Sequence, residues 1–176
     1  MKKLALLFCC LFSFGIFAQE DQTVQNSLTG LVTMVQGQLV QLADAFDESQ
    51  YDWRPAENIR SVREAILHTA AANYFLAAKM GHPSPEGVDW MGMEKNITGK
   101  ENVIAALKAS NEFILGVIAK EEASKFGEEV DFGFMKLNRL SGLLVVLDHN
   151  AEHKGQLIAY ARSNDVAPPW SQPQPE

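Results

Sequence analysis

The sequence predicts an all-α protein, a single domain folded as an antiparallel four-helix bundle. Four segments carry apolar residues three and four positions apart, the spacing of one helix face, and no segment of comparable length alternates apolar and polar residues. Most of the connections between these segments are short, as in bundles whose neighbouring helices are antiparallel. The 176 residues, 47% of them hydrophobic, suffice for one domain with a core and are too few for two.

The first two predicted helices have clear boundaries. The first runs over about Val24–Phe46, and the segment that leads to Pro55 closes it, because the residue before a proline is disfavoured in a helix. The second begins at a capping box, in which Ser61 and Glu64 each bond the amide of the other residue. Gly81, with a proline two positions later, ends this helix.

The last two predicted helices are bounded in the same way. The sequence Thr98-Gly99-Lys100-Glu101 has the pattern of a second capping box and predicts a third helix that ends near Glu122. A connection with two glycines follows, and the fourth helix is predicted over about Lys136–Arg162, ahead of Pro168-Pro169.

The connection from Gly81 to Ile97 is the exception to the short links. Connections of this length in compact domains are often functional or contain a short helix, so we expect this one to cover one end of the bundle. It carries Trp90, Met91 and Met93, which either wall a substrate pocket or form a dimer contact. The sequence leaves both roles open.

Residues 1–18 have the pattern of a secretory signal peptide. Two lysines precede the apolar run Leu4–Phe17, and the small residue Ala18 precedes polar residues, which predicts cleavage after Ala18 and export to the periplasm or the cell exterior. The apolar run is shorter than the roughly 20 residues of a membrane-spanning helix. Lipid anchoring at Cys9 or Cys10 is the competing interpretation, and the bulky residue before Cys9 disfavours it.

The composition of the mature chain excludes several functions. Both cysteines fall within residues 1–18, so the mature chain has neither disulfides nor thiolate chemistry. Removal of Lys2 and Lys3 leaves 13 basic against 22 acidic residues, a formal net charge of −9 without a basic cluster. We expect no nucleic-acid partner and, after signal removal, no membrane partner. The bundle should span residues 19–168, followed by a disordered tail at 169–176.

Two histidines in the fourth predicted helix point to a metal site. His149 and His153 lie four positions apart, so their side chains stack on one helix face at the separation that suits two ligands of one metal ion. A catalytic zinc site often uses three protein ligands and leaves a position for water or substrate. His68 is the candidate for the third ligand, because Ala71 and Ala72 leave free volume beside it. Histidines that merely hydrogen-bond in the core are the alternative.

Several segments together resemble the DinB/YfiT-like superfamily over nearly the whole mature chain. They are Tyr51-Asp52-Trp53-Arg54-Pro55, the helix start Ser61–His68, and His149-x-x-x-His153-Lys154-Gly155-Gln156 followed by Pro168-Pro169. The resemblance implies an up-down-down-up four-helix bundle, often dimeric, with a long crossover between helices two and three. It also implies one divalent metal ion, nickel or zinc, held by His68, His149 and His153. We expect a homodimer.

Three further side chains could support this site. Gln156 shares the histidine face. It could hydrogen-bond a ligand histidine or a bound water, or it could serve helix packing, and the sequence favours neither role. Tyr160, one turn further, could contact a bound molecule, although aromatic residues more often fill a core. Glu64, one turn before His68, could act as ligand or general base, but the capping box already accounts for it.

These observations support two functions. In the first, the protein is a metal-dependent enzyme in which the ion lowers the pKa of a bound water or thiol that attacks an unknown small molecule. The resemblance implies hydrolase or thiol-transferase chemistry, and export favours hydrolysis because low-molecular-weight thiols are chiefly cytosolic. In the second, the protein is a non-catalytic bundle that binds metal or a small ligand, or dimerises through its first and fourth helices. The lack of a general base beyond Glu64 and Gln156 favours this alternative.

Overall fold

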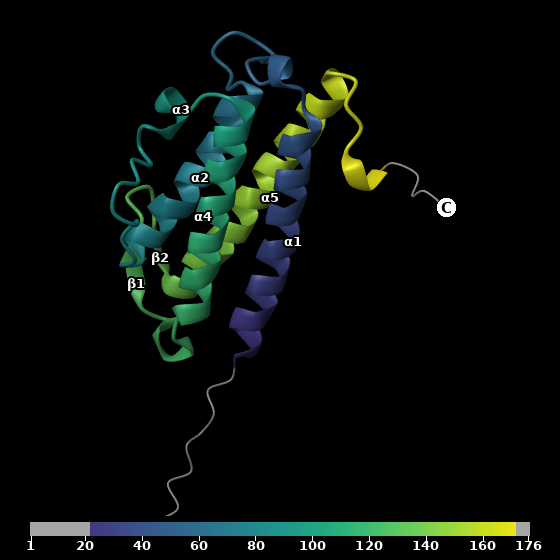
Figure 1. Ribbon diagram of the computed structural model, residues 1–176. Helices are drawn as coiled ribbons and strands as arrows, with labels where there is room; N and C mark the ends of the chain where they lie inside the picture. The colour runs from purple at the N-terminus through teal and green to yellow at the C-terminus, as the bar shows by residue number, and fades with distance from the viewer. Residues whose placement is uncertain (1–21, 172–176) are drawn as a thin grey trace, which may run out of the picture.

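The computed structural model describes residues 22–171, and four long helices dominate it (Figure 1). They are α1 (Thr23–Ala45), α2 (Val62–Lys79), α4 (Lys100–Lys120) and α5 (Arg139–Ser163). Helix α1 packs against α4 and α5, and α2 packs against the same two helices. The predicted all-α four-helix bundle is therefore confirmed.

Contacts at the helix ends establish the directions of the helices. Lys100, the first residue of α4, donates from Nζ to the Phe46 carbonyl at 2.8 Å, so α4 starts where α1 stops. The Gln50 side chain donates from Nε2 to the Asn164 carbonyl at 3.3 Å, so α1 and α5 end together. Helix α2 also begins at that end and runs back (Figure 1). The bundle is thus up-down-down-up, as the family resemblance implied.

The core consists of two apolar clusters, one toward each end of the bundle. Buried polar side chains separate them along the helices. Asn73 Nδ2 donates to Ser110 Oγ and Asn111 Oδ1, both at 3.2 Å, and Asn150 Nδ2 donates to Asn73 Oδ1 at 3.0 Å. Because buried amides need partners, these bonds favour one alignment of α2, α4 and α5. Helix α4 is long and apolar enough to cross a membrane, yet in the bundle its buried face belongs to this core.

One of the two predicted capping boxes is confirmed and the other is wrong. Ser61 Oγ accepts from the Glu64 amide at 3.2 Å, and the Glu64 carboxylate accepts from the Ser61 amide at 2.8 Å. At α4, Gly99 is the capping residue, and its φ of 83° differs from the extended backbone that a capping side chain needs. The Glu48 carboxylate accepts from the Lys100 amide instead, at 3.1 Å.

A small β-hairpin precedes α5 and was not predicted. Strands β1 (Glu129–Asp131) and β2 (Lys136–Asn138) pair antiparallel, so α5 begins at Arg139 and not at Lys136. Strands of three residues are too short to give an alternating pattern that can be recognised. The hairpin is held to the bundle by the buried Phe132, whose ring packs so closely on Gly142 that a Cβ there would clash.

The long crossover lies along the side of the bundle, which corrects the prediction that it covers an end. It leads from α2 to the short helix α3 (Met93–Asn96), which packs against α2 (Figure 1). Since α2 and α4 run in the same direction, the chain must return along the length of the bundle before α4 can start. This geometry places the crossover beside α2 and near His68.

Short 3-10 turns complete the structure at η1 (Glu48–Gln50), η2 (Ala123–Lys125) and η3 (Pro169–Ser171). The turn η3 contacts α1, so ordered structure continues past residue 168. The predicted signal peptide, with Cys9 and Cys10, and residues 172–176 of the predicted tail lie outside the described residues.

Candidate metal centre

The three histidines predicted to form a site lie together in the interior of the bundle. His68 comes from α2, and His149 and His153 come from successive turns of α5. One ring nitrogen from each lies within 4.8 Å of those of the other two. His149 Nε2 and His153 Nε2 are 3.2 Å apart. The spacing of four residues along α5 accounts for the stacked pair, and the antiparallel packing of α2 on α5 supplies the third ring.

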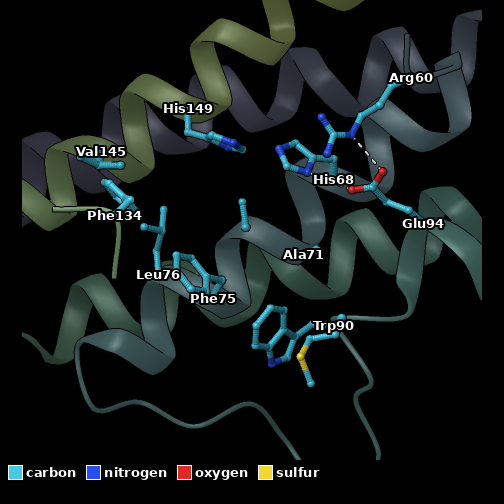
Figure 2. Close-up of a pocket in the computed structure, with 12 residues that line it drawn as sticks. Arg60, His68, Ala71, Phe75, Leu76, Trp90, Glu94, Phe134, Val145 and His149 are labelled. Atoms are coloured by element: carbon cyan, nitrogen blue, oxygen red, sulfur yellow. Dashed lines mark hydrogen bonds and ion pairs between the residues drawn. The ribbon is translucent and has the colours of Figure 1, made fainter. Parts of the chain in front are cut away.

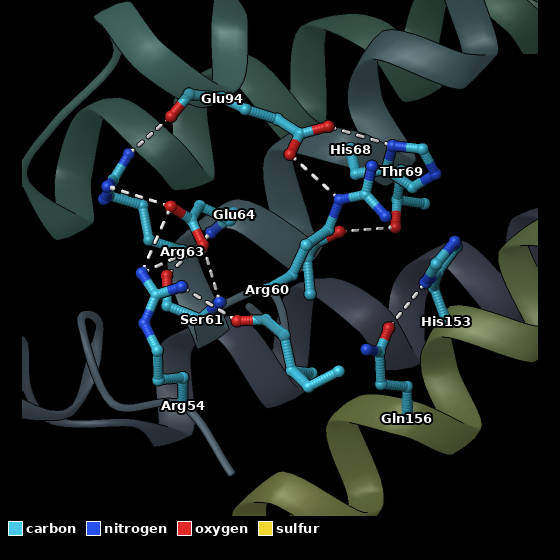
Figure 3. A network of polar contacts seen from close by, with 12 residues as sticks. Arg54, Arg60, Ser61, Arg63, Glu64, His68, Thr69, Glu94, His153 and Gln156 are labelled. Atoms are coloured by element: carbon cyan, nitrogen blue, oxygen red, sulfur yellow. Dashed lines mark hydrogen bonds and ion pairs between the residues drawn. The ribbon is translucent and has the colours of Figure 1, made fainter. Parts of the chain in front are cut away.

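Hydrogen bonds on the far side of two rings orient the cluster (Figure 3). His153 Nδ1 lies 2.7 Å from Gln156 Oε1, and His68 Nδ1 lies 3.0 Å from Glu94 Oε1. Both partners are oxygen acceptors, so each Nδ1 carries the proton and each Nε2 keeps a lone pair. The lone pairs of His68 and His153 therefore face the shared space between the three rings.

The Gln156 side chain is itself held by two further contacts. Its amide nitrogen donates to Tyr160 Oη at 2.8 Å, and the Tyr160 hydroxyl donates to the Arg60 carbonyl at 3.1 Å. The Trp53 ring packs edge-on against Tyr160, with centroids 5.4 Å apart. Since the amide nitrogen is committed to Tyr160, Oε1 must face His153. Two of the three predicted supporting residues thus lie in one chain of hydrogen bonds that leads to the cluster.

Glu64, the third of these residues, points elsewhere. Its carboxylate accepts from the Ser61 amide at 2.8 Å and from Arg54 at 3.3 Å. These bonds hold the pKa of Glu64 below its ordinary value, the backbone bond being the main cause. Glu64 serves the start of α2, in agreement with the capping interpretation.

The electrostatics of the cluster favour the neutral form of His149 and of His68. Burial, and then the neighbouring charges of His153, His68 and Arg60, lower the pKa of His149 to about 4. Burial and Arg60 also lower the pKa of His68, although Glu94 opposes this shift. Neutral imidazoles carry the lone pairs that a metal ion requires. The His149 Nδ1 atom is buried without a hydrogen-bond partner among the described residues, so this ring is oriented by packing.

A cavity of about 570 Å³ opens beside the cluster (Figure 2). His68 and His149 line one end of it, and the rest is mostly apolar. Ala71 and Ala72 are part of the wall, as expected from the free volume that small residues leave. Trp90 lines it too, so the crossover contributes to the pocket. The remaining lining residues are Arg60, Phe75, Leu76, Met91, Glu94, Phe134 and Val145.

Two charged residues at this site were not predicted. Glu94, in α3, bonds both His68 and Arg60, the latter at 2.9 Å between Arg60 Nε and Glu94 Oε2. Arg60 precedes the capping residue of α2 and has no motif of its own. The only sequence signal for Glu94 was its position as an acidic residue in a long link. Its neighbour Met93, a candidate for the pocket wall, is instead buried in the core. The path of the crossover was needed to bring Glu94 to His68.

Comparisons with known proteins support this architecture. Residues 32–157 match the family model of the DinB superfamily. An uncharacterized protein of Bacillus subtilis, YjoA, is 24% identical over 127 residues, which are 69% of this chain and 79% of that protein.

Solved structures give the same result. The crystal structure of YjoA, a DinB-like protein, has a TM-score of 0.66 at 19% identity and covers 86% of this chain and 97% of that one. A DinB-like protein from Bacillus cereus has a TM-score of 0.67 at 15% identity, with coverages of 83% and 93%. A conserved protein from Enterococcus faecalis has a TM-score of 0.66 at 15% identity, with coverages of 82% and 97%. At these identities the structural likeness shows the fold alone.

Proposed function

The chain belongs to the DinB superfamily, and from that premise we propose that His68, His149 and His153 hold one divalent metal ion, nickel or zinc, in a metal-dependent enzyme. The enzyme would be a hydrolase or thiol transferase that acts on a small molecule in the adjoining cavity. One observation carries the proposal. Two Nε2 lone pairs, fixed by Glu94 and Gln156 on the opposite sides of their rings, face a third neutral imidazole.

The donor set fits such an ion. Three neutral imidazoles suit zinc and nickel, and ligand histidines in metal sites commonly donate their other N–H to a carboxylate or carbonyl group. His68 and His153 make contacts of this kind. A bound ion would act as a Lewis acid toward a molecule in the cavity. The residues of the chain would then orient the imidazoles and keep water away from the apolar walls.

Metal analysis of the untagged chain starting at residue 19 tests the binding. We expect about one divalent ion per chain by mass spectrometry after loading with Zn²⁺ or Ni²⁺ and desalting. His153→Ala should abolish binding. His82→Ala is the matched control, because this fourth histidine bonds Glu121 outside the cluster and its loss should leave the metal content unchanged. Wild-type protein that retains no metal would refute the site.

A non-catalytic metal- or ligand-binding module is the second candidate, and the environment of Glu94 favours it. Glu94 is the carboxylate that lines the cavity, and both of its oxygens are bonded, one to His68 and one to Arg60. A general base must reach the proton that it takes from the substrate, whereas these two bonds hold Glu94 toward His68 and Arg60. A panel of ester, amide and thiol-acceptor substrates, assayed with metal-loaded wild type and His153→Ala, separates the two functions. Metal-dependent turnover that His153→Ala lacks supports the enzyme.

Export and dimerisation are also proposals. The pattern of residues 1–18 supports cleavage after Ala18 and a periplasmic or extracellular location, where hydrolysis is favoured over thiol transfer. N-terminal sequencing of the protein recovered from cell fractions tests the cleavage, and a chain that still begins at Met1 would contradict it. Light scattering tests the homodimer, for which a mass of one chain would be the contrary result.

A further inference from the structure

Arg60 lies at the end of the cavity that His68 and Glu94 line, here called the polar end. Part of its guanidinium makes no hydrogen bond within the described residues. Its Nε donates to Glu94 at 2.9 Å, while its two terminal nitrogens have no hydrogen-bond or ion-pair partner among the described residues. Figure 2 shows the guanidinium beside His68 and directed toward the end of the cavity where His149 lies. Two free terminal nitrogens form a planar fork that matches the two oxygens of a carboxylate.

The rest of the cavity suits an apolar body. Phe75 packs against Trp90 from the crossover and Phe134 from the hairpin, with ring centroids 5.8 and 6.5 Å apart. Ala71 and Ala72 leave room between these rings and the histidines. The volume of about 570 Å³ falls within the range of small-molecule sites. A ligand that fills it therefore meets aromatic walls at one end and the guanidinium at the other.

The charges at the polar end favour an anion. Arg60 and Glu94 are the charged residues that line the cavity, and they offset one another. The ion of the proposed function would add two positive charges held by neutral imidazoles. The Arg60 side chain is 43% exposed, so only the part of this positive charge that borders the apolar walls carries a desolvation cost. An anionic group at this end removes part of that cost, whereas an uncharged group does not.

We propose that the cavity binds a carboxylate with an apolar body, the carboxylate bonded to Arg60 and the body packed against Phe75 and Trp90. This inference rests on the proposed function for the contribution of the metal. The Arg60 fork and the aromatic walls belong to the chain itself, so the selectivity for a carboxylate should persist after the metal is removed.

Calorimetric titrations with octanoate and its uncharged analogue octan-1-ol test the proposal in untagged protein, first chelated and then loaded with Zn²⁺. We expect octanoate to bind at least about tenfold more tightly than octan-1-ol. Arg60→Gln should remove most of this preference. Arg162→Gln makes the same charge change at an exposed site in the last turn of α5 and should keep it. From butanoate to octanoate, each added methylene should strengthen binding about fourfold, as its burial predicts.

The outcomes separate this inference from the proposed function. Equal affinities for octanoate and octan-1-ol, or equal losses in Arg60→Gln and Arg162→Gln, would overturn it. Zn²⁺ uptake is measured on the same samples. Protein that takes up no Zn²⁺ but binds octanoate through Arg60 would refute the metal site and support the carboxylate site. Protein that takes up Zn²⁺ without preferring octanoate would support the metal site and refute the carboxylate site. Circular dichroism of each variant excludes unfolding as the cause.

Discussion

Two histidine–glutamate pairs, one with its histidine within α2 and one with its histidine just beyond the end of α2, differ in what surrounds them. His68 Nδ1 lies 3.0 Å from Glu94 Oε1, and His82 Nε2 lies 2.8 Å from Glu121 Oε1. The Glu94 side chain is 33% exposed and borders the cavity, whereas that of Glu121 is only 2% exposed. The two pairs share their chemistry and differ in their burial.

The Glu121 pair belongs to a closed network. Arg139 contacts both Glu121 oxygens, at 2.9 and 3.2 Å, and donates to the Met80 carbonyl. Gln25 donates to the Glu121 backbone carbonyl at 3.1 Å. Together these bonds connect all four long helices at one end of the bundle. At His68, by contrast, the second ring nitrogen faces His149 and His153. A histidine–glutamate pair can thus stabilise the fold where the carboxylate is buried, as at Glu121. It can orient a metal ligand where the second ring nitrogen of the histidine is unobstructed, as at His68.

The largest effect should come from breaking the closed network. Arg139→Ala leaves the buried Glu121 carboxylate without its main partner, and we expect the free energy of unfolding to fall by about 3 kcal/mol. Zn²⁺ affinity should be unchanged. Urea denaturation and calorimetry measure the two quantities. Lys136→Ala, which removes an exposed ion pair with Glu129, is the control and should cost less than about 1 kcal/mol. Similar losses in the two variants would contradict the contrast between the two pairs.

The converse pattern is expected at Glu94. Glu94→Gln keeps the size of the side chain but weakens the acceptor for His68 Nδ1–H, so Zn²⁺ affinity should drop by about tenfold to a hundredfold. The melting temperature of chelated protein should change little, because the residue is partly exposed. Competition with a zinc-binding dye measures the affinity. Glu101→Gln, an exposed change in the first turn of α4, serves as the comparison. A lower melting temperature without a lower Zn²⁺ affinity would show that Glu94 stabilises the fold and does not orient His68.

The metal-free cluster should also make stability depend on pH. The folded pKa of His149 is about 4, below its ordinary value of 6.5, so the unfolded chain binds more protons between these values. Stability should therefore fall as the pH drops from about 6.5 to 4 and level off below that. With partial solvent exposure the loss should be about 1–2 kcal/mol. Urea titrations of chelated protein measure it, and His149→Gln should lack this component. An identical pH dependence in the variant would assign the loss to other groups.

The smallest effect concerns Gln156. Gln156→Leu removes the acceptor for His153 Nδ1–H and the donor to Tyr160, and we expect a loss of about 1 kcal/mol in Zn²⁺ binding, roughly fivefold. Gln156→Glu keeps the acceptor and should restore most of the affinity. Calorimetry at constant pH compares the three proteins. If Gln156→Leu and Gln156→Glu bind Zn²⁺ with the same affinity, the Gln156 side chain serves packing and does not orient His153.

The sequence sufficed for the elements that depend on local interactions. The apolar spacing of α1 predicted its bounds to within a residue, and the box at Ser61 and Glu64 fixed the start of α2. Local patterns failed where a distant group replaced a local one. Thr98 was expected to cap the start of α4 through the Glu101 amide, but Gly99 is the capping residue, and Glu48, more than 50 residues away, accepts from the Lys100 amide. Phe132 anchors a hairpin whose strands are too short to be recognised.

The candidate site divides in the same way. The pairing of His149 with His153, and the position of Gln156 one turn further, follow from helical geometry and so were predictable from spacing. His68 was found because its alanine neighbours leave space and because the family resemblance marks that position. Arg60 and Glu94 were missed. No local periodicity relates a link residue to a helix that it packs against.

The sequence by itself therefore determined where the four long helices lie, which face of α5 carries the histidines, and that a third histidine was available on α2, because each depends on spacing within one segment. Only the tertiary structure decided that the crossover runs along α2, that Glu94 meets His68 while Glu121 is enclosed by Arg139, and that Arg60 faces an apolar cavity. These features join residues far apart in the chain, and their geometry follows from how the helices pack.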